Sequence, residues 1–128
     1  MRTLLILFAS LCCASAQNYA NQFKNTLPAT NAWVAYSLPG GKLYDLTIYN
    51  VSASLLYVHV FDSNVVPSDG AFPTLAPQPL PANSSISYSY TGGRGFTNGI
   101  TICTSTTPIT LTNGTASFKI DISYGGSQ

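Results

Sequence analysis

Apolar and polar residues alternate with a period of two along most of this chain, and this pattern constrains the fold more than any other feature. Alternation places successive side chains on opposite faces of a β-strand. The sequence therefore predicts strands, and it shows no helical periodicity after its first residues. The predicted strands cover residues 32–38, 42–50, 53–62, 84–91, 99–105, 109–112 and 115–124.

Glycine and proline separate these strands. Pro39-Gly40 predicts a type II turn, because proline fixes the first central φ and glycine accepts the positive φ of the second position. Five of the eight prolines lie in residues 65–82, so this segment is expected to be an extended crossover or an edge strand. The pattern predicts an all-β chain: a single antiparallel β-sandwich of about seven strands, jelly-roll or Ig-like.

The short link between the second and third predicted strands indicates antiparallel neighbours. Their apolar faces set a register. It pairs Ile48 with Leu56, Leu46 with Val58, Tyr49 with Leu55, and Thr47 with Tyr57. The same register places Asp45 beside His59 as a polar cross-strand pair.

The first sixteen residues have the features of a secretory signal peptide. Arg2 precedes an apolar run, and Ala14-Ser15-Ala16 offers the small side chains that a signal peptidase requires for cleavage after Ala16. The run is shorter than the roughly 20 residues of a transmembrane helix, so no transmembrane span is expected. The predicted organisation is a signal peptide at 1–16, an N-terminal arm at 17–30 and a β-sandwich domain at 31–128. The alternative is an uncleaved apolar terminus.

Charge and cysteine content limit the partners. Of the five Lys and Arg residues, Arg2 leaves with the signal peptide, so four basic side chains balance four aspartates. A neutral surface with scattered charges excludes nucleic acid as a partner, and low net charge favours association with a protein partner or a homo-oligomer. Cys103 is the one cysteine outside the signal peptide, which leaves no internal disulfide.

Asp45 and His59 could together orient an imidazole for nucleophilic catalysis, with Cys103 or a serine as the third group. The sequence carries no motif that fixes this third group. One histidine, four dispersed aspartates and one thiol also have no metal-ligand spacing. We therefore expect no enzyme, no metal and no cofactor, and interpret Asp45–His59 as a structural pair.

Aromatic residues suggest a possible binding face. An exposed platform for carbohydrate would use Trp33, Tyr49, Tyr57, His59 and Phe61. The alternative is that both faces of the sheet are buried, in the sandwich or at a subunit contact. The chain also has three N-glycosylation sequons, at Asn50, Asn83 and Asn113, which matter only in a eukaryotic secretory host.

Three segments, "LTIYNVSASLLYVHVFD", "VPSDGAFP" and "GRGFTNGITICTSTTP", resemble small β-rich virion-associated proteins of tailed phages and prophages. The resemblance covers about Leu43 to Tyr124 and lies in strand and turn signatures. It implies a sandwich on or near a virion surface. The location is thus either secreted and extracytoplasmic, or a virion.

Two functions remain open at this point. The first is a non-enzymatic structural or interaction domain, exported or virion-associated, that mediates assembly or surface binding. The second is a secreted carbohydrate-binding module that uses the aromatic face to bind a cell-surface glycan.

Overall fold

The computed structural model describes residues 22–26, 31–113 and 118–126. These residues contain eight β-strands and no helix. The strands are β1 (Gln22–Thr26), β2 (Ala32–Tyr36), β3 (Gly41–Asn50), β4 (Leu56–Asp62), β5 (Gln78–Leu80), β6 (Ser85–Phe96), β7 (Ile100–Ser105) and β8 (Phe118–Gly126). The predicted signal peptide lies outside the described residues, whereas part of the predicted arm is a strand, β1, that pairs with β8.

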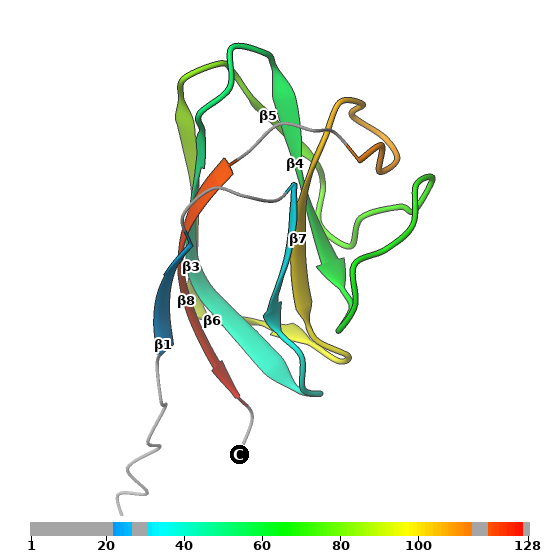
Figure 1. The fold of residues 1–128 in the computed structure, drawn as a ribbon. Coiled ribbons are helices and arrows are strands. Elements are labelled where there is room, and N and C mark those ends of the chain that lie inside the picture. Colours follow the sequence, from blue (N-terminus) through cyan, green and yellow to red (C-terminus); the bar gives the residue numbers. More distant parts are fainter. Residues whose placement is uncertain (1–21, 27–30, 114–117, 127–128) are drawn as a thin grey trace, which may run out of the picture.

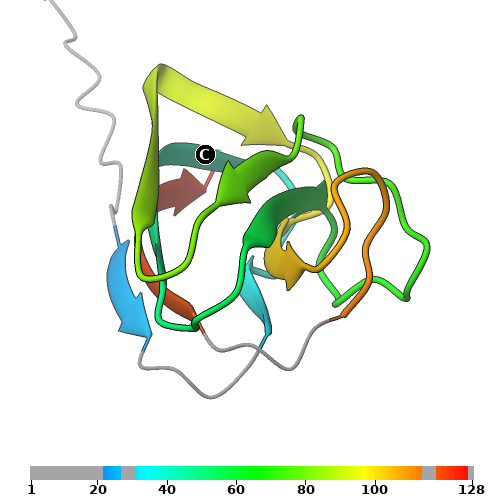
Figure 2. The same ribbon diagram turned by 90° about the horizontal axis from the view of Figure 1, so that it is seen from above.

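The strands form two four-stranded antiparallel sheets (Figure 1). Sheet A has the order β1-β8-β3-β6, and sheet B has the order β2-β7-β4-β5. Figure 2 shows the two sheets facing each other around the interior. This order, in which the first strand neighbours the last and every connection except β4–β5 crosses between the sheets, is that of an eight-stranded jelly roll. The prediction of an antiparallel sandwich is confirmed, and the topology is the jelly-roll alternative.

The predicted pairing between the second and third strands is wrong. In the structure β3 pairs with β6 and β8, whereas β4 pairs with β5 and β7 in the other sheet. Leu46 and Val58 both lie in the core, but they enter it from opposite sheets. Alternation identifies the apolar face of each strand, and it does not say whether two such faces lie side by side or opposite one another.

The side chain of Asn50 holds the chain where it crosses from sheet A to sheet B. Its amide Nδ2 donates to the carbonyl oxygens of Ser54, Leu80 and Pro81 at 2.8, 3.0 and 3.0 Å. Its Oδ1 accepts from the backbone N–H and the hydroxyl of Ser52. Only 2% of Asn50 is exposed. The short link therefore bends away from a hairpin because a buried amide satisfies its backbone groups.

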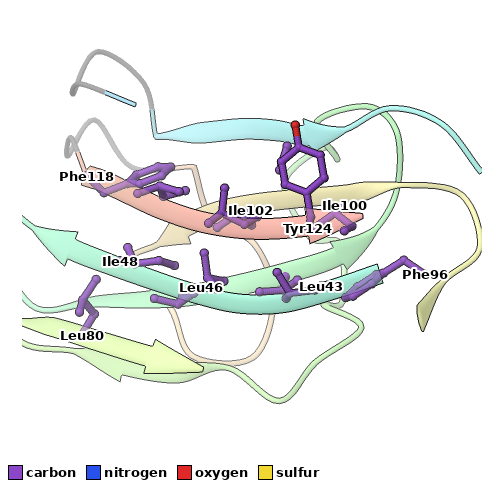
Figure 3. Packing of buried hydrophobic residues seen from close by; sticks show 14 residues of the cluster. Leu43, Leu46, Ile48, Leu80, Phe96, Ile100, Ile102, Phe118 and Tyr124 are labelled. Carbon is purple, nitrogen blue, oxygen red and sulfur yellow. The ribbon is translucent and has the colours of Figure 1, made fainter. Parts of the chain in front are cut away.

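The core lies between the sheets (Figure 3). Both sheets contribute large aliphatic side chains that are almost fully buried. The aromatic residues Phe96, Phe118 and Tyr124 pack in the same cluster. The alternation of the last strand predicts Phe118, Ile120, Ile122 and Tyr124 as its inward residues, and all four are buried in the core. Every residue of β7 is buried, so this strand lacks a solvent face.

Two other segments differ from expectation. The glycine-rich sequence TGGRG, residues 91–95, is typical of a turn or flexible loop, but these residues continue β6 as an irregular stretch in which Gly92 and Gly93 have positive φ. The predicted strand at 109–112 is irregular, and an isolated bridge joins the next residue, Asn113, to Ser105. The proline-rich segment does contain a short edge strand, β5, and Gly40 has the positive φ of 75° that the predicted turn requires.

Candidate functional site

The five residues of the predicted binding face do not form one face. Trp33 packs against the core between the sheets, and Tyr49 is 39% exposed on the outer face of sheet A. Tyr57, His59 and Phe61 alternate with inward valines of β4 and so lie on the outer face of sheet B. The single aromatic platform predicted from the sequence is therefore absent.

The predicted Asp45–His59 pair is also wrong, because the two residues lie in different sheets. Asp45 accepts a 2.7 Å hydrogen bond from the hydroxyl of Ser89 on β6. His59 lies opposite Cys103 on β7. No carboxylate is therefore positioned by the ladder to orient the imidazole.

His59 is fully buried on the outer side of sheet B. Its Nε2 is 3.2 Å from the carbonyl oxygen of Thr107, and its ring centroid is 6.1 Å from that of Phe61. Burial lowers the pKa of the imidazole, and the Thr107 carbonyl offsets this only in part. A neutral ring that donates from Nε2 leaves a lone pair on Nδ1, and no described group donates to that atom.

Cys103 lies beside this histidine in the ladder and is equally inaccessible. Burial raises the pKa of its thiol to about 12. The thiolate is the nucleophilic form of cysteine, so this side chain remains an unreactive thiol at neutral pH. His59 and Cys103 thus form an internal cluster, and neither presents a reactive group to a substrate.

Two loops cover this cluster. Leu111 is fully buried against Phe61 and Cys103, and its backbone exchanges hydrogen bonds of 2.8 Å with Gly70 and Ala71 of the opposite loop. Asp69 accepts from the backbone N–H and the side-chain amide of Asn113 at 2.9 and 2.7 Å. The segments 63–77 and 106–113 are therefore fastened together over sheet B.

Asp62 is the last residue of β4 and holds a neighbouring turn in place. Its carboxylate accepts hydrogen bonds from the backbone N–H groups of Thr97, Asn98 and Gly99. Desolvation raises the pKa of this carboxyl, but the three backbone hydrogen bonds outweigh it and the net shift is downward. Asp62 is thus a carboxylate that holds the β6–β7 turn against β4, and its acceptor sites are occupied by the chain itself.

The outer face of sheet A is open by contrast. A hollow of about 590 Å³ lies where β3 ends, and it is lined by Tyr49, Asn50, Val51, Asn83, Ser84, Ser85, Lys119 and Asp121. The lining combines one exposed aromatic ring with a basic, an acidic and several hydroxyl or amide groups. These are the groups that bind sugar hydroxyls, although the sequence alone placed only Tyr49 in such a site.

A second hollow, of about 450 Å³, lies between β6 and the segment that leads into β5. Its lining includes Leu75, Gln78, Ile86, Tyr88 and Tyr90. The hydroxyl of Tyr88 is buried and makes no hydrogen bond among the described residues. Burial and the neighbouring Tyr90 raise the pKa of Tyr88 to about 12. Side chains therefore leave space between β6 and the segment before β5.

The three sequons differ in accessibility. The amide of Asn50 is buried and fully used, and that of Asn113 is bound to Asp69. Asn83 is exposed in the turn before β6. Within residues 22–26, 31–113 and 118–126 there is no cluster of three metal-ligating side chains, and none of these residues forms a helix long and apolar enough to cross a membrane.

Fold and surface together define a jelly-roll domain whose candidate reactive groups are internal. No protein-family model and no curated protein sequence matches the chain. Among solved structures, it is similar to the Tobacco streak virus coat protein, with 17% sequence identity, 88% of this chain and 91% of that chain covered, and a TM-score of 0.39. The strand order, rather than this distant likeness, defines the fold.

Proposed function

We propose that this chain is a non-enzymatic structural domain that assembles with other protein chains, either exported from the cell or on a virion. The observation that carries the proposal is the edge of sheet A at β6, a strand of twelve residues that pairs on one side only among the described strands. Unpaired strand edges are sites where another chain can add. The internal position of His59 and Cys103 supports a role without catalysis.

The surface composition supports the same role. Basic and acidic side chains balance after removal of residues 1–16, so two copies do not repel one another at long range. The predicted signal peptide supports export, and the resemblance to virion-associated phage proteins supports a place on a virion. The mass of the protein purified from a secreting host separates these locations, because cleavage after Ala16 leaves Gln17 as the first residue.

The test of assembly is light scattering over a wide concentration range, combined with intact mass spectrometry. A defined oligomer is the expected result. The proposed function would be contradicted if the protein stayed monomeric at the highest soluble concentration and also bound no other protein chain of the virion or cell surface.

A second candidate function is glycan binding at the hollow that Tyr49, Lys119 and Asp121 line. An exposed aromatic ring beside polar groups favours it. Binding to a glycan array should be lost in Tyr49→Ala and kept in Tyr57→Ala, which changes a tyrosine on the other sheet. Equal binding by both variants would exclude this site.

A further inference from the structure

β5 is an edge strand of sheet B and β6 is an edge strand of sheet A, and the two edges differ in length and proline content. β5 has three residues, and Pro77, Pro79 and Pro81 lie in or beside it. Proline lacks the N–H that a new strand would need, so this edge is protected against strand addition. β6 has twelve residues without a proline. Of the two edges, only β6 can accept another strand over several residues.

The hydrogen-bond phase of β6 shows which of its backbone groups face the free edge. The N–H of Asn50 donates to the carbonyl of Ser84 at 2.8 Å, and these residues continue the β3–β6 register. In an antiparallel ladder the bonded residues alternate, so Ile86 and Tyr88 also bond to β3. The N–H and C=O groups of Ser85, Ser87 and Ser89 therefore point away from β3, where no described strand receives them.

The free edge is complementary to itself. From Ser85 to Gly93 the strand carries no charged side chain. If two copies pair antiparallel about Ser87, then Ser85 faces Ser89 and Ile86 faces Tyr88 of the second copy. The outward groups of the two edges then form hydrogen-bonded pairs, and no like charges are opposed.

The inner side of the same strand has space for a partner. Ile86, Tyr88 and Tyr90 point toward the interior but stay half-buried, and they line the hollow of about 450 Å³ next to Leu75. An antiparallel strand added to β6 places its own alternate side chains on this inner side. Ile86 and Tyr88 of the second copy would thus lie at the mouth of the hollow, near the unsatisfied hydroxyl of Tyr88.

We propose that a second copy of this chain adds to the free edge of β6, antiparallel and about a two-fold axis at Ser87, so that sheet A continues from one protomer into the next. The inference rests on the proposed assembly function and specifies its partner and register. A two-fold interface of this kind is isologous, because each copy contributes the same strand.

Disulfide trapping tests the register. The full chain, with Cys12→Ala and Cys13→Ala, carries Ser87→Cys, and Cys103 stays buried. Ser87 would lie opposite its own copy, so oxidation should produce a covalent dimer. Ser85→Cys is the matched control on the same strand. Its offset of four residues separates the two sulfur positions by roughly 14 Å, too far for a bond, whereas a mixture of Ser85→Cys and Ser89→Cys should cross-link.

The edge itself is tested by Ser87→Pro. This substitution removes an N–H that points to the free edge and leaves the backbone hydrogen bonds to β3 in place. It also removes the exposed hydroxyl–hydroxyl contact of Ser87 with Thr47 on β3, and the monomer should still keep its fold by circular dichroism. The dissociation constant of the dimer, measured by sedimentation equilibrium, should rise at least roughly tenfold, since backbone hydrogen bonds across the edge are lost. If Ser87→Pro fails to fold, Ser87→Lys, which opposes two like charges at the axis, replaces it.

The outcomes separate this inference from the function on which it rests. Equal cross-linking of Ser87→Cys and Ser85→Cys, or an oligomer unaffected by the proline and lysine variants, would overturn the β6 interface while assembly through another surface would stand. An unmodified protein that never associates, with itself or with another chain, would overturn both.

Discussion

The outer faces of the two sheets have the same strand geometry and opposite environments. On sheet A the outward residues are mostly serine, threonine and a few charged side chains, and Lys119, Asp121 and Ser85 are exposed. On sheet B the outward residues include His59, Thr101 and Cys103, and all three are fully buried. The difference arises from the loops, because segments 63–77 and 106–113 fold over sheet B and are fastened to each other there.

This comparison explains why one face can serve as a binding surface and the other as a second core. Buried polar groups such as His59 and Thr101 require internal partners, and the loops supply them through the carbonyls of Thr107 and Ser63. Sheet A needs no such cover, because its outward polar side chains are at the surface, where Thr47 contacts Ser87 and Ser89 donates to Asp45. Its surface and its edge remain available to a partner.

The largest expected contrast between the faces is in thiol reactivity. Cys103 on sheet B should react with Ellman's reagent on the order of 10³-fold more slowly than a cysteine placed at Ser85 on sheet A, because burial raises its pKa to about 12 and reduces the thiolate. The measurement is the absorbance of released thionitrobenzoate at pH 8, with urea-unfolded protein as the control. Similar rates in the folded state would mean that the loops do not cover sheet B.

The next contrast is in stability, between one aromatic residue from each outer face. Phe61→Ala should lower the free energy of unfolding by about 3–4 kcal/mol, because only 4% of the residue is exposed and a cavity would remain. Tyr49→Ala should lower it by less than about 1 kcal/mol, since 39% of that residue is exposed. Urea denaturation of both variants gives the comparison. Equal losses would show that the two faces are packed alike.

A third prediction concerns the crossing between the sheets. Asn50→Ala should cost about 2–3 kcal/mol, because three carbonyl oxygens and Ser52 lose a buried partner. Asn64→Ala, at an exposed asparagine, should change stability by no more than about 0.5 kcal/mol. Thermal and urea unfolding of both variants test this. If Asn50→Ala is as mild as its control, another group must hold the crossing.

The sequence predicted the strands and their core faces better than their arrangement. The alternation in β8 identified Phe118, Ile120 and Ile122 as core residues, because one face of that strand meets water and the other meets the interior. The same rule did not separate β3 from β4, and the short link between them wrongly indicated neighbours in one sheet. Pairing in a jelly roll joins strands that are distant in sequence, and the signal that separates β3 from β4 is a single amide, that of Asn50, in a link that resembles a hairpin turn.

The candidate sites were less predictable for a related reason. His59 and Phe61 were expected on an exposed face, and alternation placed them correctly on the outward side of β4. Their burial depends on loops with little periodicity, which the sequence did not position over them. The free edge of β6 also depends on strand order. It can be identified only once the hydrogen bond from Asn50 to Ser84 shows which backbone groups of β6 point away from β3.

The smallest expected effect is a pH dependence that reports on the cover of sheet B through the single histidine of the chain. Burial holds the pKa of His59 below the ordinary value, about 6.5. As the pH falls below that value, the unfolded chain takes up a proton before the folded chain does. The free energy of unfolding should therefore decrease as the pH falls from about 6.5 toward the folded pKa, and the loss should stop below it.

His59→Phe should remove this slope, whatever its effect on absolute stability. The chain has one histidine, and the other types of side chain have ordinary pKa values well away from 6. Asp62 does not interfere. Its pKa is lowered too, but its contribution is lost only as the pH falls through values below that of an ordinary aspartate, about 3.9. Urea denaturation at several pH values between 5 and 7.5 measures the slope. If the parent protein and His59→Phe had the same slope, His59 would titrate as an exposed residue does. The loops would then fail to shield the outer face of sheet B from water, and the two outer faces would not differ in this respect.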